Sequence, residues 1–279
     1  MALITAAALH EEMHSSVPRH LFDCRFDLRD HCAGAKAYAN GHIQGAQYLH
    51  LEHDLSGDRT GLNGRHPLPD AQNFATRLGS LGLAPDMPVA VYDDAGGMIA
   101  ARVWWMLRWI GHRGDVAVLD GGIQAWTAAG YALSQKPQTF PAQPYPLVKA
   151  GDVVGVSDVL SFLGASSTYL LDARSPDRFR GENETLDPVG GHIPGAHNRF
   201  FRDNLTDNGH FKSPHQLHEE FTTLLGGVTP ASVVHSCGSG VTACHNLLAM
   251  EVAGLAGSRL YAGSWSEWSS DPARPVEKG

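Results

Sequence analysis

The strongest constraint on this chain is an internal repeat: four segments of its first half recur, in the same order, in its second half. An apolar run ending in Asp-x-Arg is followed in both copies by Gly-His-Ile-x-Gly-Ala. The matched segments are 21–25 with 170–174, 41–46 with 191–196, 88–97 with 231–240, and 119–126 with 261–268. Four collinear matches indicate a duplication, and therefore two homologous domains.

The segment between the two copies is rich in proline, which favours an extended chain over a helix. Its prolines are Pro137, Pro141, Pro144 and Pro146. We therefore expect a first domain at 1–135, a linker at 136–150 and a second domain at 151–279.

Each copy alternates short β-branched runs with helical patterns, which is typical of an α/β fold with a mostly parallel sheet flanked by helices. In the second copy, residues 232–236 form a short apolar run that predicts a buried strand. Apolar residues then recur every three or four positions from Val241 to Val252, which predicts a helix. Ligands of open α/β sheets bind at the carboxyl ends of strands, and Cys237 lies at such an end.

Composition excludes several classes of protein. The formal charge is −8 and there is no basic run, so nucleic acid is not an expected partner. The longest apolar stretches fall short of the ~18 residues of a membrane span, so a membrane is not expected either. Four cysteines are too few for a disulfide scaffold in 279 residues, and the first residues lack the positive region of a signal peptide. We expect a cytoplasmic protein.

One motif suggests a metal. His10-Glu11-Glu12-Met13-His14 fits the H-E-x-x-H pattern of zinc proteases. It lies at the N-terminal edge of the first copy, and the sequence offers no third zinc ligand. We therefore expect no metal site there, and we expect no cofactor elsewhere.

The loop that follows the predicted strand at 232–236 favours a reactive Cys237. Two glycines, Gly238 and Gly240, let successive backbone amides turn toward one point, and the predicted helix adds the positive end of its dipole. Both effects favour a thiolate, the nucleophilic form of cysteine. Ser239 and Thr242 offer hydroxyl donors to the same point. A buried, inert cysteine beside a tight turn is the alternative interpretation.

The first copy has no equivalent nucleophile. The residue that matches Cys237 there is Asp94, followed by Ala-Gly-Gly-Met. A carboxylate cannot act as a sulfur nucleophile, so we expect the first domain to be catalytically inactive and to help shape the substrate site.

These motifs together resemble the rhodanese family, specifically its two-domain thiosulfate and 3-mercaptopyruvate sulfurtransferases. The resemblance spans essentially the whole chain. It is carried by Gly-His-Ile-x-Gly-Ala in both halves, Asp-Ala-Arg-Ser-Pro-Asp-Arg-Phe-Arg-Gly at 172–181, Cys-Gly-Ser-Gly-Val-Thr-Ala at 237–243, and Gly-Ser-Trp-Ser-Glu-Trp at 263–268.

The resemblance implies tandem rhodanese-like domains and double-displacement chemistry without a cofactor. Cys237 then carries sulfur as a persulfide, and Ser239 assists it. The remaining loop residues that shape the catalytic site are Gly238, Gly240, Val241 and Thr242. Arg178 matches an arginine that binds the substrate anion, while Asp54 and His66 match residues that face the cleft from the first domain.

The resemblance also concerns the sulfur donor. Thiosulfate-type enzymes carry basic residues directly after the cysteine, whereas Gly238 and Ser239 stand there in this chain, as in the mercaptopyruvate type. The family's second substrate arginine, nine residues after Arg178, is replaced by Asp187, and Arg180 is a candidate substitute. We expect a small anionic donor, 3-mercaptopyruvate rather than thiosulfate, and a thiol or cyanide acceptor.

Three other functions were weighed. A phosphatase of the C-x5-R kind needs an arginine where this chain has Ala243. A non-catalytic binding module would need both loops to be inactive. Sulfur relay to a protein acceptor shares the persulfide step, so the sequence leaves that alternative open.

Overall fold

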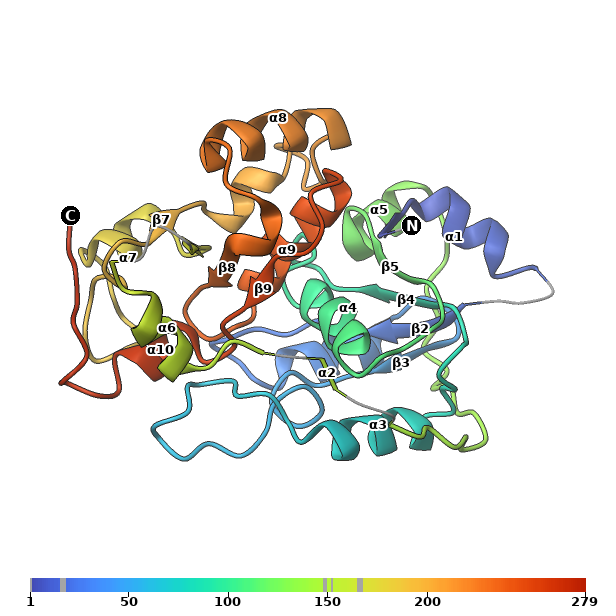
Figure 1. Cartoon of the computed structure of the whole chain (residues 1–279). Helices are drawn as coiled ribbons and strands as arrows, with labels where there is room; N and C mark the ends of the chain where they lie inside the picture. Colours follow the sequence, from blue (N-terminus) through green and yellow to red (C-terminus); the bar gives the residue numbers. More distant parts are fainter. Residues whose placement is uncertain (1, 16–18, 148–149, 152, 165–167) are drawn as a thin grey trace. The chain divides into compact units, whose positions relative to one another are not determined.

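The computed structural model describes residues 2–15, 19–147, 150–151, 153–164 and 168–279 (Figure 1). They form two compact units, and each unit takes in a short segment from the other half of the sequence. The first contains Met1–Gly57, Leu68–Asp152 and Asp207–His210. The second contains Asp58–Pro67, Val153–Thr206 and Phe211–Gly279.

The first unit is built on a parallel sheet with the strand order β1-β5-β4-β2-β3. Helix α4 lies against β4 and β5, and α1 packs against α5 (Figure 1). The elements are β1 (Leu3–Ile4), α1 (Ala6–Glu12), β2 (His20–Asp23), α2 (Ala33–Asn40), β3 (Ala46–Tyr48), α3 (Ala71–Ser80), β4 (Val89–Tyr92), α4 (Ala100–Trp109), β5 (Val116–Leu119) and α5 (Gly122–Ala128).

The second unit is built on a parallel sheet with the strand order β7-β6-β8-β9. Helix α9 lies against β8 and β9, and α8 packs on α9 (Figure 1). The elements are α6 (Val156–Phe162), β6 (Tyr169–Asp172), α7 (Pro176–Arg180), β7 (His197–Asn198), η1 (Phe201–Asn204), α8 (Pro214–Leu225), η2 (Pro230–Ser232), β8 (Val233–Ser236), α9 (Ala243–Val252), β9 (Arg259–Leu260) and α10 (Ser264–Trp268).

The two sheets have the same topology. Strands β5-β4-β2-β3 of the first correspond to β9-β8-β6-β7 of the second. A parallel bridge between Val154 and Tyr261 stands where β1 pairs with β5 in the first unit. The predicted α/β class with parallel sheets is confirmed.

The repeated Asp-x-Arg motif makes the same contact in each unit. The Arg25 guanidinium donates to the Asp23 carboxylate at 2.6 Å, and Arg174 donates to Asp172 at 2.8 Å. Both arginines also donate to a backbone carbonyl at the Gly-His-Ile motif. All four side chains are buried, so each pair is hydrogen-bonded as a buried charge requires. The motif ties each central strand end to the next loop.

The core of each unit follows from the alternation of side chains along its strands. In the first unit, Ala90 and Tyr92 join a buried cluster that includes Leu9 of α1 and Trp126 of α5. In the second, Val234 lies in a cluster whose other members come from α6, β6, α10 and the segments that flank the strands: Val154, Val159, Leu170, Ile193, Tyr261, Trp265 and Trp268. Every residue of α9 from Ala243 to Met250 is buried. The loop that precedes α9 is therefore attached to the most deeply packed helix of its unit.

The proline-rich segment expected as a linker packs on the first unit. Its Gln143 amide donates to the Gly79 carbonyl at 2.9 Å. Tyr145 is buried, and its hydroxyl lies 2.7 Å from Nδ1 of His112. Residues 148–149, at the end of the expected linker, lie outside the described residues. Among the described helices, none combines the length and apolarity that crossing a membrane requires.

Candidate active site

Cys237 follows the last residue of β8, a strand paired on both sides with β6 and β9. The loop 237–242 then connects β8 to α9, which begins at Ala243. This is the strand–loop–helix position that the sequence predicts. The Cys237 side chain is only 1% exposed. A donor therefore reaches its sulfur only past the groups that border the loop.

The two loop glycines are required for different reasons. Gly240 has φ +75°, and a Cβ there would lie 2.2 Å from the Ala262 carbonyl oxygen. Both the left-handed backbone and the close approach exclude other residues. Gly238 instead leaves room for the guanidinium of Arg65, because a Cβ at this position would lie 2.9 Å from Nη2 of Arg65. The loop thus brings a guanidinium directly against the backbone beside Cys237.

The first residues of α10 fix the backbone of the loop 237–242. The amides of Trp265 and Ser266 donate to the carbonyls of Cys237 and Gly238, each at 2.9 Å. The Ser264 hydroxyl accepts from the Cys237 amide at 3.0 Å and lies 4.0 Å from its Sγ. Among the described residues, Ser264 is the only one other than glycine with a positive φ, at 52°. Such backbone strain is typical of residues that position a functional group.

The structure brings His66 and Ser239 together. Nδ1 of His66 lies 2.8 Å from the Ser239 hydroxyl, and both side chains are buried. The resemblance implies that His66 faces the cleft from the first domain, but its segment, Asp58–Pro67, belongs to the second unit. The serine–histidine pair is therefore built within one unit.

Arg178 lies beside the loop, with Nη1 and Nη2 3.6 and 3.5 Å from the position of a Cβ at Gly238. Its guanidinium binds Glu184, with Nη2 at 2.8 Å from one carboxylate oxygen and Nε at 3.1 Å from the other. Arg178 also contacts Asp187 at 3.5 Å, and Arg65 forms a close ion pair with the same Asp187. Four charges therefore surround the Gly238 side of the loop.

These four charges form two layers. The carboxylates of Glu184 and Asp187 are 3% and 2% exposed, whereas the side chains of Arg178 and Arg65 are 20% and 25% exposed. The acids thus lie beneath, and the guanidiniums form the outer layer. Buried acids of this kind hold an arginine in one orientation.

The charge environment follows from burial and pairing. Burial opposes ionisation of Glu184, but hydrogen bonds from Arg178 and two backbone amides outweigh it and lower its pKa. Burial raises the pKa of Asp187, although Arg65 favours its charged form. Burial also opposes the charge on Arg174, but Asp172 and Glu184 outweigh it and raise the pKa of Arg174.

Two residues predicted for the substrate site have other partners. Arg180 pairs with Glu182 at the surface, at 2.8 and 2.9 Å, so the structure does not support it as a replacement for the second substrate arginine. Asp54 belongs to the first unit, where it accepts from the His50 amide and from Arg77, each at 2.7 Å.

Sequence reasoning missed three residues that border the loop. Arg65 directly precedes His66, and Glu184 lies in the same acidic stretch as Asp187, but charge alone did not distinguish them from surface residues. Ser264 belongs to the Gly-Ser-Trp-Ser-Glu-Trp motif, which was noted only as part of the repeat. The signal that could have identified Ser264 was a hydroxyl side chain within a repeated motif.

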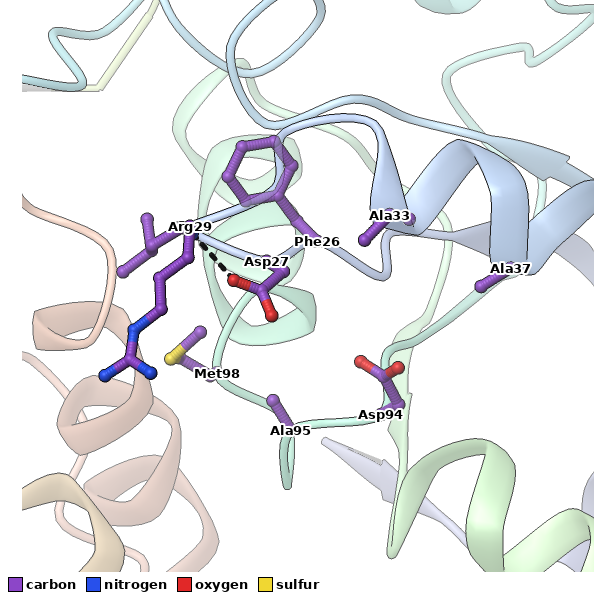
Figure 2. Close-up of a pocket in the computed structure, with 10 residues that line it drawn as sticks. Phe26, Asp27, Arg29, Ala33, Ala37, Asp94, Ala95 and Met98 are labelled. Atoms are coloured by element: carbon purple, nitrogen blue, oxygen red, sulfur yellow. Dashed lines mark hydrogen bonds between the residues drawn. The ribbon is translucent and has the colours of Figure 1, made fainter.

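The matching loop of the first unit borders a cavity of about 480 Å³ (Figure 2). Asp94, Ala95 and Met98 line it from the loop after β4, and Phe26, Asp27 and Arg29 line it from the loop after β2. Partial burial and the neighbouring Asp93 raise the pKa of Asp94. The Asp94 carboxylate thus borders the cavity. The prediction that Asp94 matches Cys237 is wrong by one residue, because strand pairing places Asp93 at that position.

Comparison with known proteins agrees with this architecture. The Rhodanese-like domain family matches residues 5–129 and 156–271. A probable 3-mercaptopyruvate sulfurtransferase of Pseudomonas aeruginosa is 49% identical over 265 residues, covering 93% of this chain and 92% of that protein. A putative thiosulfate sulfurtransferase, SseB, of Mycobacterium tuberculosis is 39% identical over 290 residues, covering 99% and 97%.

Among solved structures, 3-mercaptopyruvate sulfurtransferase from Leishmania major has a TM-score of 0.85 at 31% identity, covering 96% of this chain and 74% of that one. The family match extends over most of the sequence and over both units. This chain belongs to the rhodanese-like family.

Proposed function

We propose that this chain is a sulfurtransferase in which Cys237 carries sulfur from 3-mercaptopyruvate, or less efficiently from thiosulfate, to a thiol or cyanide. The observation that carries the proposal is the setting of Cys237 on a backbone-locked loop at the carboxyl end of a central strand, with two guanidiniums beside it. The relatives named for mercaptopyruvate chemistry support the choice of donor.

In the first half-reaction, the Cys237 thiolate attacks the sulfur of the donor. A sulfur–sulfur bond forms and the donor's carbon–sulfur bond breaks, with its electron pair passing to the carbon. That carbon takes up the donor's thiol proton, so the products are the Cys237 persulfide anion and pyruvate. Charge and atoms balance without a cofactor. The second half-reaction transfers the outer sulfur to the acceptor and restores the thiolate.

The surrounding residues have separate roles in this proposal. Ser239, hydrogen-bonded to His66, is placed to pass the donor's proton and to polarise its carbonyl. Arg178 binds the donor carboxylate. The backbone of Gly238, Gly240, Val241 and Thr242 forms the cradle for the persulfide anion. A role for Asp54 at the same site stays a prediction from the resemblance.

The division of labour is also part of the proposal. The first domain, at 1–135, is catalytically inactive, the segment 136–150 is the linker, and the domain at 151–279 carries the chemistry. The four cysteines are free thiols in the structure. A reducing compartment, the cytoplasm, suits a carrier that must return to the thiolate.

The test is the intact mass of the protein after brief exposure to 3-mercaptopyruvate and, separately, to thiosulfate. We expect wild type to gain one sulfur and Cys237→Ser to gain none, with both proteins equally stable to heat. The more efficient donor identifies the reaction. No gain with either donor would contradict the proposal and favour a binding module or a dedicated protein donor.

A further inference from the structure

The position of Asp187 presents a difficulty for an anion-binding site. The resemblance implies a second substrate arginine at the position that Asp187 occupies, and the Asp187 carboxylate is buried beside the loop that carries Cys237. Arg178 alone would then have to bind the donor while sharing its guanidinium with Glu184 and Asp187. A second cation is needed, and the contacts around Gly238 identify it.

The segment Asp58–Pro67 brings Arg65 to the loop and fixes its backbone. The Arg65 amide donates to the Ser266 hydroxyl at 2.9 Å. Gly64, with φ +87°, packs so tightly that a Cβ there would lie 2.9 Å from the Gly263 carbonyl. Because Ser266 also donates its amide to Gly238, the segment and the catalytic loop are held by the same turn.

The guanidinium of Arg65 uses only one of its ends for protein contacts. Its Nη1 binds Asp187 and lies 3.5 Å from the Leu186 carbonyl. Its Nη2 lies against Gly238 and, among the described residues, donates to no protein atom. Nη1 of Arg178 likewise lies against Gly238 without an acceptor in the described part of the chain. Two guanidinium nitrogens therefore face the same point with unused donors.

We propose that Arg65 is the second donor-binding arginine of this site, and that Asp187 holds it in place and makes the site selective for a singly charged carboxylate. The inference rests on the proposed sulfur transfer. The donor carboxylate bridges Arg65 and Arg178 over Gly238, which places the donor's sulfur-bearing carbon toward Cys237.

Selectivity follows from the charge balance of the same four residues. Two guanidiniums are offset by two buried carboxylates, so a bound monoanion leaves one net negative charge and a dianion leaves two. Excess charge is costly where water is largely excluded. The site therefore disfavours thiosulfate more strongly than 3-mercaptopyruvate.

The experiment measures kcat and KM with both donors for Arg65→Gln, with Arg59→Gln as the control. Arg59 is an exposed arginine of the same segment, so the change in net charge is matched. We expect Arg65→Gln to lower kcat/KM for 3-mercaptopyruvate roughly 10- to 100-fold, mainly through KM, since it loses a charge-assisted hydrogen bond. Arg59→Gln should stay within twofold of wild type.

A double variant distinguishes the loss of donor binding from misfolding. Arg65→Gln leaves the buried Asp187 with only its 3.5 Å contact to Arg178, whereas Arg65→Gln with Asp187→Asn removes both charges and keeps the shape. The double variant should show the same loss. Asp187→Asn alone should raise the ratio of thiosulfate to 3-mercaptopyruvate kcat/KM at least fivefold, because it adds one net positive charge. Arg65→Lys should recover part of the activity.

The outcomes separate this inference from the proposed function. If wild type forms the persulfide but the folded double variant keeps its kcat/KM within twofold, Arg65 does not bind the donor. An unchanged donor ratio in Asp187→Asn would overturn the selectivity. If wild type forms no persulfide with either donor, the proposed function itself fails.

Discussion

The loops that follow β4 and β8 occupy the same position in the duplicated fold, but they differ in which group accepts hydrogen bonds from their backbone amides. In the first unit, the Asp93 carboxylate accepts four of them, from Ala95, Gly97, Ile99 and Ala100, at 2.8 to 2.9 Å. The residue at the matching position of the second unit is Cys237: the Asp93 carbonyl accepts from the Ile123 amide, as the Cys237 carbonyl accepts from the Trp265 amide.

This difference explains why one loop is structural and the other suits catalysis. In the first unit an internal anion fills the cradle of amides, so the loop is satisfied without a ligand. In the second unit the residue at this position is Cys237, so no permanent carboxylate fills the cradle. The cradle of one copy stabilises the fold, and we propose that the cradle of the other stabilises a persulfide anion.

The largest effect is expected from placing a buried carboxylate next to Cys237 in the second unit. Ser236→Asp should place a carboxylate under the loop and repel the Cys237 thiolate and persulfide. We expect a roughly 100-fold or greater loss in the rate of persulfide formation, the magnitude typical of losing preorganised electrostatic stabilisation. Rapid-quench intact mass measures this rate. Ser236→Ala is the control, and near-normal rates in a folded Ser236→Asp protein would refute the comparison.

A smaller effect, on stability, is expected from removing the internal anion of the first unit. Asp93→Asn leaves an amide NH2 facing backbone donors, so at least two buried hydrogen bonds are lost. The free energy of unfolding should fall by about 2–4 kcal/mol. Denaturant titration of the whole chain measures the fall, with the exposed Asp94→Asn as the matched control at under about 0.5 kcal/mol. Equal stabilities of the two variants would show that the four amide contacts contribute little.

The smallest effect is a dependence of stability on pH. Burial lowers the pKa of His235, on β8, from 6.5 to about 3. Its stabilising contribution is complete above pH 6.5 and is lost as the pH falls toward 3, because only the unfolded chain takes up the proton readily. The cost approaches about 1.4 kcal/mol per pH unit in that window.

The first unit provides the contrast, since its matching residue is Val91, which does not titrate. Unfolding by urea between pH 7 and pH 5 tests the prediction, and His235→Gln should show a shallower pH dependence than wild type. Identical slopes for the two proteins would exclude His235 as the source.

Much of the fold was predictable because the chain repeats itself. The strand at 232–236 is observed as β8 from Val233, and the helical pattern from Val241 to Val252 is observed as α9 from Ala243. Buried strands and a largely buried helix require apolar residues in a pattern that a short stretch of sequence already shows. The Asp-x-Arg motif, which both copies keep, forms the same buried pair in each unit.

The composition of the site was less predictable because its charged residues come from distant segments. His66 was selected through the resemblance, but its neighbour Arg65 was not, and Arg180 was put forward although it pairs with Glu182 at the surface. A lone arginine in sequence gives no sign of which carboxylate it will meet. The ion pair of Arg65 with Asp187 joins residues 122 positions apart.

The sequence alone determined the duplication, the parallel α/β class and the place of Cys237, because periodic patterns and local motifs encode strand, loop and helix directly. Only the tertiary structure decided that Asp58–Pro67 joins the second unit, that Asp93 fills the amides of the first loop, and that two guanidiniums meet over Gly238. These features depend on side chains far apart in the chain, whose pairing is set by burial and charge once the sheets have formed.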